Sequence, residues 1–211
     1  MSVTGAYLDT AAQAVTLLGA PEVASCWEKA SALTGMTVGG LAGHLAYQVF
    51  SVTPAVQEPT SPEAPIPLLE HYARAAWIDA PRDGEVNAGI RAKGEDIASE
   101  GAQVLLERVR AALAEQKVAL PVVRVGGVVF MPQTGWALSL DDFLVTRMVE
   151  LAVHMDDLAV SVKIAAPELS ATAFEPVLTL LAGLAARRHG QAALLRALAR
   201  AERAPSAINA L

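Results

Sequence analysis

The sequence predicts a mainly α-helical protein, and three observations indicate this fold class. The 211 residues include 42 alanines and 26 leucines, which enter helices at little cost. Aromatic residues, which help to fill large sheets, make up only 5% of the chain. Apolar residues recur at helical spacing along several segments bounded by glycine or proline. This length suffices for one domain with a sizeable core, or for one domain with a helical appendage.

Composition and charge exclude several classes of protein. A hydrophobic content of 53% at a net charge of -6 excludes a disordered chain. The acidic balance, with no basic run longer than Arg187-Arg188, excludes a nucleic-acid partner. Residues 177–186 are too few to cross a membrane, which takes roughly 20 apolar residues. Cys26 is the single cysteine and the N-terminus lacks a basic signal region, so we expect a cytoplasmic location.

Four helices are expected in the first part of the chain. Thr4 is the expected N-cap of the first, which ends at Gly19 before Pro21. Thr37 is the expected N-cap of the second. A proline-rich loop then separates it from the third helix, and the fourth shows an apolar repeat of seven residues. The second helix is expected over residues 38–50 and the loop over residues 54–67. The third helix is expected over residues 68–78 and the fourth over residues 87–116.

A short β signal precedes the remaining helices. Residues 122–125 and 128–131 are expected to form a hairpin with Gly126-Gly127 as its turn. Ser139, with Asp142 three residues later, resembles a capping box at the start of a helix that runs to about residue 162. Two further helices are expected over residues 170–189 and 191–203, on either side of Gly190. Two strands do not make a sheet-based fold, so the mainly helical prediction stands.

The expected helix over residues 140–162 is apolar on most sides, but it carries one stripe of polar side chains. Steps of three, four, three and four residues separate its members, Arg147, Glu150, His154, Asp157 and Ser161. Composition alone favours a narrow solvent face, because charged residues are seldom buried. The alternative is an internal cleft, in which Glu150 and His154 lie on one face and reach the same ion.

A metal site needs a further ligand, and His44 is the best candidate. It lies on the flank of an otherwise apolar helix. The alternative for such a histidine is a single hydrogen bond in or near the core. Two other histidines are weaker candidates: His71 lies on a helix expected to be exposed, and His189 lies at a helix C-terminus, where the dipole favours a cation.

Two segments carry a resemblance to a known family. They are GMTVGGLAGHLA, within residues 27–48, and DDFLVTRMVELAVHMDDL, within residues 140–160. Together they resemble the N-terminal domain of mycothiol-dependent maleylpyruvate isomerases, part of the DinB/YfiT-like group of metal-binding four-helix bundles. The helix order and the hairpin also fit. The resemblance implies a bundle over residues 1–163, and residues 164–211 then form a helical extension packed on it.

The resemblance also implies a ligand set and a cofactor. In that family one histidine of the second bundle helix, with a glutamate and a histidine four residues apart on the last, holds a metal ion, usually zinc. The matching positions are His44, Glu150 and His154. The implied thiol cofactor is mycothiol, for which Arg91 and Arg147 are candidate binding residues. Alternatively, Arg91 lies on a helix face exposed to solvent. Arg147 alternatively forms a structural ion pair, or it contacts and orients the metal ligands.

The ligand set suggests the chemistry. Two neutral imidazoles and one carboxylate leave zinc with a net charge of about +1 and an open position, as in catalytic sites. Such a site holds a thiol as the nucleophilic thiolate. We therefore expect a thiol-using isomerase or transferase that acts on an electrophilic small molecule. The alternatives are a non-enzymatic metal-binding or regulatory bundle, and a purely structural bundle with its polar stripe in solvent.

The extension leaves two questions open. Isomerases of the family have a sizeable C-terminal domain, whereas residues 164–211 read as two helices, so the resemblance does not specify the substrate. Bundles of the wider group often pair as dimers. The apolar C-terminal helices either supply the surface of a homodimer or cover the core of a single chain.

Overall fold

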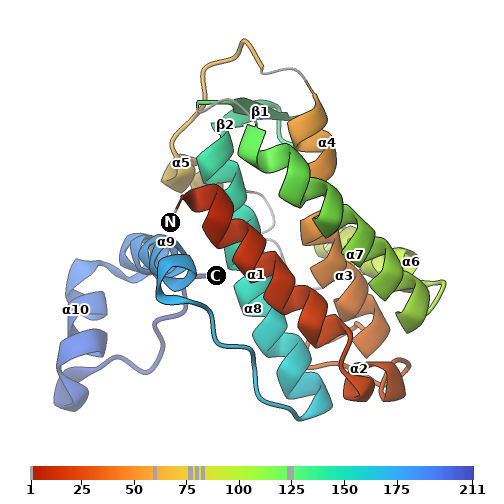
Figure 1. The fold of residues 1–211 in the computed structure, drawn as a ribbon. Coiled ribbons are helices and arrows are strands. Elements are labelled where there is room, and N and C mark those ends of the chain that lie inside the picture. Colours follow the sequence, from red (N-terminus) through yellow and green to blue (C-terminus); the bar gives the residue numbers. More distant parts are fainter. Residues whose placement is uncertain (1, 59–60, 76–77, 79–80, 82–83, 123–125) are drawn as a thin grey trace.

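The computed structural model describes residues 2–58, 61–75, 78, 81, 84–122 and 126–211. These residues are mainly helical, with one small hairpin (Figure 1). The helices are α1 Val3–Leu18, α2 Pro21–Ser25, α3 Val38–Phe50, α4 Val52–Gln57, α5 Leu68–Arg74, α6 Glu85–Ala98, α7 Ala102–Ala119, α8 Leu140–Val162, α9 Ala171–His189 and α10 Gln191–Ala199. The strands are β1 Val128–Met131 and β2 Trp136–Ser139. The mainly helical prediction is confirmed.

The long helices α1, α3, α7 and α8 pack along one another around a shared apolar core (Figure 1). The helix α8 lies deep in this core because it is apolar on most sides. Leu144, Met148 and Leu151, for example, have no exposed surface. The hairpin lies at one end of the bundle, next to the start of α8 (Figure 1). The arrangement matches the expected bundle.

Glycines let α6 pack directly on α3. A Cβ atom added at Gly43 would lie 2.1 Å from the backbone oxygen of Gly94, and one added at Gly94 would lie 2.5 Å from the oxygen of Gly40. The two backbones therefore touch without side chains between them. This contact also brings α6 to His44, whose Cβ lies 3.3 Å from the same added atom at Gly94.

The two helices that carry the predicted metal ligands begin as expected. The Thr37 hydroxyl accepts a hydrogen bond from the Gly40 amide and caps α3. The Ser139 hydroxyl accepts one from the Asp142 amide, 3.0 Å away, and caps α8. The N-cap of α1 is Ser2, so the prediction of Thr4 is wrong by two residues. These caps fix the first residues of α3 and α8, and the positions of the later side chains around each helix follow from them.

The predicted single helix over residues 87–116 is wrong. The structure has two helices, α6 and α7, and the chain turns between them at Gly101 with φ +91°. A residue in this left-handed conformation cannot continue a right-handed helix. Of the third predicted helix, residues 68–74 are helical, and residues 76–77 lie outside the described residues. The expected loop 54–67 contains most of α4.

The predicted hairpin has the wrong partner strand. Residues 128–131 form β1 as expected, but β1 pairs in antiparallel fashion with β2, from Val128 opposite Ser139 to Met131 opposite Trp136. The turn is thus at residues 132–135 and not at Gly126-Gly127. Val122 ends a short 3₁₀ helix, and the rest of the predicted first strand, residues 123–125, lies outside the described residues.

The C-terminal helices differ in how they pack. The helix α9 lies against α1 and α8 and adds four buried residues to the core, Ala173, Val177, Leu180 and Leu184. The helix α10 packs on α9 and has no buried residue. Within the described part of the chain, no helix combines the length and the apolar content that crossing a membrane requires.

Candidate metal centre

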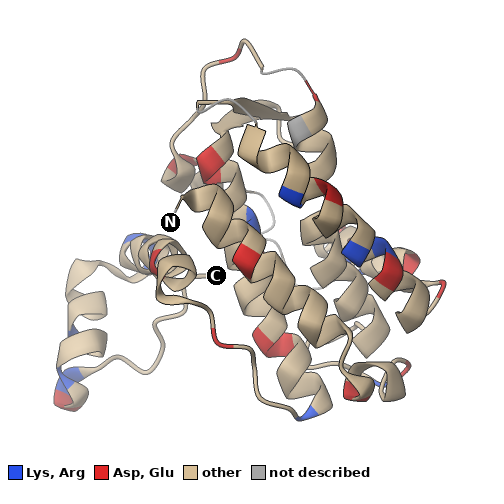
Figure 2. Cartoon of the chain, viewed as in Figure 1, with Lys and Arg blue, Asp and Glu red and all other residues tan. Residues whose placement is uncertain are grey.

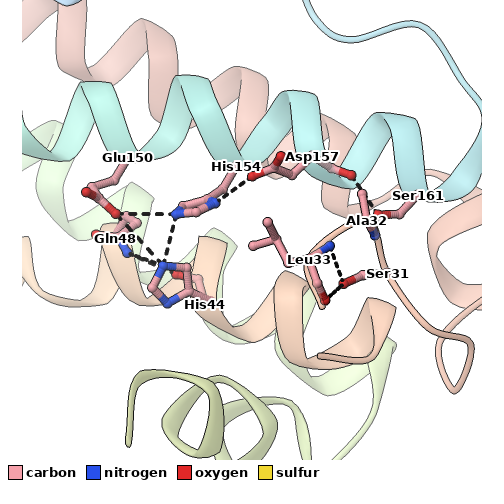
Figure 3. Close-up of polar contacts among 9 residues, drawn as sticks. All are labelled: Ser31, Ala32, Leu33, His44, Gln48, Glu150, His154, Asp157 and Ser161. Carbon is pink, nitrogen blue, oxygen red and sulfur yellow. Dashed lines mark hydrogen bonds and ion pairs between the residues drawn. The ribbon is translucent and has the colours of Figure 1, made fainter. Parts of the chain in front are cut away.

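The structure brings His44, Glu150 and His154 together where α3 and α8 lie side by side (Figure 3). The Nε2 atoms of the two histidines are 3.1 Å apart. The Glu150 Oε2 atom lies 3.4 Å from His154 Nε2 and 3.9 Å from His44 Nε2. The three side chains are only 13% to 16% exposed. This part of the polar stripe therefore faces α3 and not the solvent.

The spacing of these three atoms fits a zinc ion. In a tetrahedral site with metal–ligand bonds of about 2.0–2.1 Å, neighbouring ligand atoms lie about 3.3 Å apart. The observed separations of 3.1, 3.4 and 3.9 Å bracket that value. Two imidazole nitrogens and one carboxylate oxygen are also a donor set that zinc accepts, and three protein ligands leave a fourth position open.

Asp157 fixes the orientation of His154. Its Oδ2 atom lies 3.0 Å from His154 Nδ1, the ring nitrogen that points away from Glu150 (Figure 3). With a proton on Nδ1 donated to the carboxylate, the Nε2 lone pair is left for a metal ion. The next turn of α8 is held as well, since the Ser161 hydroxyl accepts a hydrogen bond from the Ala32 amide and donates one to the Asp157 carbonyl.

The electrostatics of the cluster favour bound cations. Burial acts to raise the pKa of Glu150, but hydrogen bonds from His154 and His44 and the charge of Arg147 hold it well below its usual range. Burial acts to lower the pKa of His154, yet the Asp157 and Glu150 carboxylates raise it to about 9. Burial lowers the pKa of His44. Without a metal ion, His154 is therefore protonated on both ring nitrogens at neutral pH, one proton facing each carboxylate, and a bound metal would replace the proton on Nε2.

Gln48 holds Arg147 beside the cluster. Arg147 Nη1 donates a hydrogen bond of 2.6 Å to Gln48 Oε1, and Gln48 Nε2 donates to the His44 carbonyl and faces His44 Nε2 at 3.5 Å. Gln48 is 2% exposed. Sequence reasoning missed it, although it lies one helical turn after His44 on α3. The arginine is thus anchored at the cluster by an amide, and its positive charge reaches Glu150.

Comparison with known proteins places the chain in a family. The family model described as the mycothiol maleylpyruvate isomerase N-terminal domain matches residues 8–159. The chain belongs to this family. The match includes α3 and α8, so it spans His44, Glu150 and His154. The resemblance inferred from the sequence is confirmed.

Two solved structures share the fold of this family member. A crystal structure of the mycothiol-dependent maleylpyruvate isomerase is 17% identical, with a TM-score of 0.54, and the match covers 88% of this chain and 67% of that one. A histidine-to-alanine mutant of that enzyme is 16% identical, with a TM-score of 0.51 and coverages of 89% and 71%. At such low identity the likeness shows the fold alone. No curated protein matches the chain.

The two arginines predicted to bind a cofactor lie in different surroundings. Arg147 lies next to the cluster of His44, Glu150 and His154, since it donates a hydrogen bond to Gln48, which contacts His44. Arg91, on α6, lies against Gly35 in the segment before α3, where its Cδ and Nε atoms are 3.3 Å from the position of an added Cβ. This contact puts Arg91 beside the start of α3 and does not by itself bring it to the cluster.

His71 is buried, so the prediction of an exposed helix at this position is wrong. It is 8% exposed, and its Nδ1 atom accepts a hydrogen bond of 3.1 Å from Trp136 Nε1. Burial, with a contribution from the charge of Arg147, lowers the pKa of His71 to about 4. The cause of the error is tertiary, because the strand that covers α5 lies 65 residues further along the chain. His189 contacts the Asn209 carbonyl at the end of α9.

Proposed function

We propose that this chain is a metal-dependent enzyme that uses the thiol mycothiol to isomerise or conjugate an electrophilic small molecule. The observation that carries the proposal is the cluster of His44, Glu150 and His154, whose ligand atoms lie within 3.1–3.9 Å of one another. Membership of the mycothiol maleylpyruvate isomerase N-terminal domain family supports the choice of thiol and reaction class. The enzymes named in the two related crystal structures support it as well.

In this proposal His44, Glu150 and His154 hold a divalent ion, zinc being the expected one. When bound, the ion acts as a Lewis acid that lowers the pKa of a thiol in its open position, so that the thiol is present as thiolate. Asp157 keeps the imidazole of His154 in the ligating tautomer. Glu150 stays ionised across the physiological range because its pKa is held down.

Arg147 and Arg91 are the proposed cofactor-binding residues. Arg147 adds a fixed positive charge next to the ion, and Gln48 prevents that side chain from turning away. A cationic group in a partly dry site favours an anionic ligand such as a thiolate. Arg91, on α6, lies beside the start of α3, and we propose that it contacts a part of the thiol cofactor away from the sulfur. A cytoplasmic location fits a thiol-dependent enzyme with a single cysteine.

The test is turnover that depends on both the metal and the thiol. Zinc-loaded protein is incubated with mycothiol and either maleylpyruvate or a panel of electrophiles, and thiol loss and products are followed by mass spectrometry. We expect product only when zinc and mycothiol are both present, and none with Glu150→Gln. His189→Ala, a change at a histidine remote from the cluster in sequence and on another helix, is the matched control and keeps activity.

Two results would overturn the proposal. Turnover without mycothiol would mean that the thiol is not the cofactor. Zinc binding with no consumption of any electrophile would instead support a non-enzymatic metal-binding or regulatory bundle.

A further inference from the structure

The helix α10 presents apolar side chains that nothing in the described structure covers. Leu195 is 66% exposed and Leu198 is 74% exposed, and they lie three residues apart on one face. None of the nine residues of α10 is buried. The helix stands away from the bundle, next to α9 (Figure 1). Paired apolar anchors at this spacing are typical of a helix that binds in a groove.

A groove with matching chemistry lies at the other end of α9. It has a volume of about 350 Å³ and is formed by α8, the segment after it and the first turn of α9. Its walls are mostly apolar, and they include Ala152, Met155, Leu169 and Phe174, the last of which is 49% exposed. This side of α8 is not the polar stripe, so the groove is separate from the metal centre.

A chain cannot fill this groove with its own α10. Phe174 is 16 residues before Gly190, or about 24 Å along α9 at 1.5 Å per residue. Leu198 is eight residues after Gly190, which gives a reach of about 12 Å even if α10 folded straight back along α9. Only Gly190 links the two helices, so no longer linker adds to this reach. The α10 helix of the same chain is therefore not an occupant of this groove.

Charge indicates that the occupant of the groove is a second copy of this chain. The exposed carboxylates Asp156 and Glu168 line the groove. Arg196 and Arg200 flank the two leucines at the end of α10. Figure 2 shows basic residues on α10, with an acidic one beside them at its far end, and acidic residues on α8 and in the segment before α9, with a basic one at the end of α8. Each copy therefore offers a basic apolar helix and an acidic apolar groove, which complement each other.

We propose that two copies of the chain form a dimer by exchanging α10, each inserting Leu195 and Leu198 into the groove of the other. Both copies use the same two surfaces, so the contact closes on itself with two-fold symmetry. Arg196 and Arg200 lie near the partner copy's acidic groove wall, and Gly190 is the hinge. A Cβ atom added at Gly190 would meet nothing within 4 Å, so no neighbouring group crowds that side of the link between α9 and α10.

The first test measures mass in solution by sedimentation equilibrium over a range of protein concentrations. We expect wild type at twice the mass of one chain, and Leu195→Glu with Leu198→Glu at the mass of one chain. Val118→Glu is the matched control, since Val118 is 75% exposed on α7 and undergoes the same chemical change. Because both leucines are exposed, their replacement leaves the core intact, which circular dichroism checks.

The second test exchanges the charges. Asp156→Arg with Glu168→Arg gives a basic groove, and Arg196→Glu with Arg200→Glu gives an acidic α10. Each double variant alone is expected to dimerise at least about tenfold more weakly, because like charges meet in both contacts. An equimolar mixture of the two restores dimerisation, since each contact then joins opposite charges.

Three results would overturn the proposal. They are a monomeric wild type at every concentration, a dimer that the leucine variant leaves intact, and a mixture of charge variants that stays monomeric. The readout is mass and not activity, so a failure of the proposed enzyme function would leave this inference unaffected.

Discussion

At the scale of single residues, the candidate centre depends on groups that hold the ligands as much as on the ligands. His154 has a carboxylate on each ring nitrogen, Asp157 at Nδ1 and Glu150 at Nε2. The first holds the Nδ1 proton, and in the proposed function the second would bind the same metal ion as His154. Sequence spacing placed Glu150 and His154 on one helix face, because residues four apart share a face, and the family resemblance favoured a metal site over a solvent face. It did not reveal Gln48, whose role depends on a side chain 99 residues away.

Replacing Asp157 by Asn is expected to weaken zinc binding about 10- to 100-fold, because the amide no longer accepts the Nδ1 proton with a full negative charge. Competition with a chromogenic chelator measures the affinity. Asp156→Asn is the control, since this neighbour is exposed and faces the groove. Equal affinities in the two variants would show that Asp157 has no part in holding the ligand.

His71 is expected to make the folded state sensitive to acid. Its pKa of about 4 in the folded chain is below the ordinary 6.5, so the unfolded chain binds more protons between these values. Its contribution to the free energy of unfolding is complete above pH 6.5 and is lost as the pH falls toward 4. We expect the free energy of unfolding to fall by about 2 kcal/mol, a figure that already allows for screening by the solvent that still reaches the His71 side chain. Denaturation by urea should show a shallower pH slope for His71→Gln, and an unchanged slope would contradict the assignment.

At the scale of elements, the contact between α3 and α6 positions His44. Local signals predicted α3 and α8 well, because Thr37 and Ser139 cap them and their apolar faces are continuous. Local signals failed for α6 and α7, since the apolar repeat runs through the break at Gly101. They also failed for the hairpin, where Gly126-Gly127 is a good turn sequence but the strand pairing lies further on. The backbone conformation of Gly101 decides the first case, and the pairing of β1 with β2 decides the second.

Gly94→Ala tests the close contact of these helices. The added Cβ would lie 2.5 Å from the Gly40 oxygen, so one backbone must move. We expect a loss of about 2–3 kcal/mol of unfolding free energy, as for other overpacked sites. Gly89→Ala is the control on the same helix, where nothing lies within 4 Å, and it should gain about 0.5–1 kcal/mol from helix propensity. Equal effects in urea denaturation would contradict the packing.

At the scale of the whole molecule, the C-terminal helices have separate roles. The helix α9 shares the core of the bundle through four buried residues, and α10 adds none. The resemblance set the predicted start of the extension after residue 163 and the sequence pattern predicted two helices in it, yet neither distinguished these roles, because both helices are rich in alanine and leucine. The difference lies in what each helix packs against.

Truncation tests the division at residue 163. A chain ending there loses Ala173, Val177, Leu180 and Leu184 from the core, so we expect it to unfold at lower urea concentration or to aggregate. A chain ending at His189 keeps all four and should lose much less stability. If residues 1–163 alone matched the full chain in denaturation, the bundle would be independent of α9.

The measurement that tests the metal centre most directly is the zinc content of the purified protein by elemental analysis. The triad predicts about one zinc ion per chain in wild type and in His189→Ala, and little or none in His44→Ala or Glu150→Ala. Circular dichroism on the same samples shows whether each variant is folded. Equal zinc content in wild type and in both ligand variants, all folded, would contradict the assignment of His44, Glu150 and His154 as the metal site.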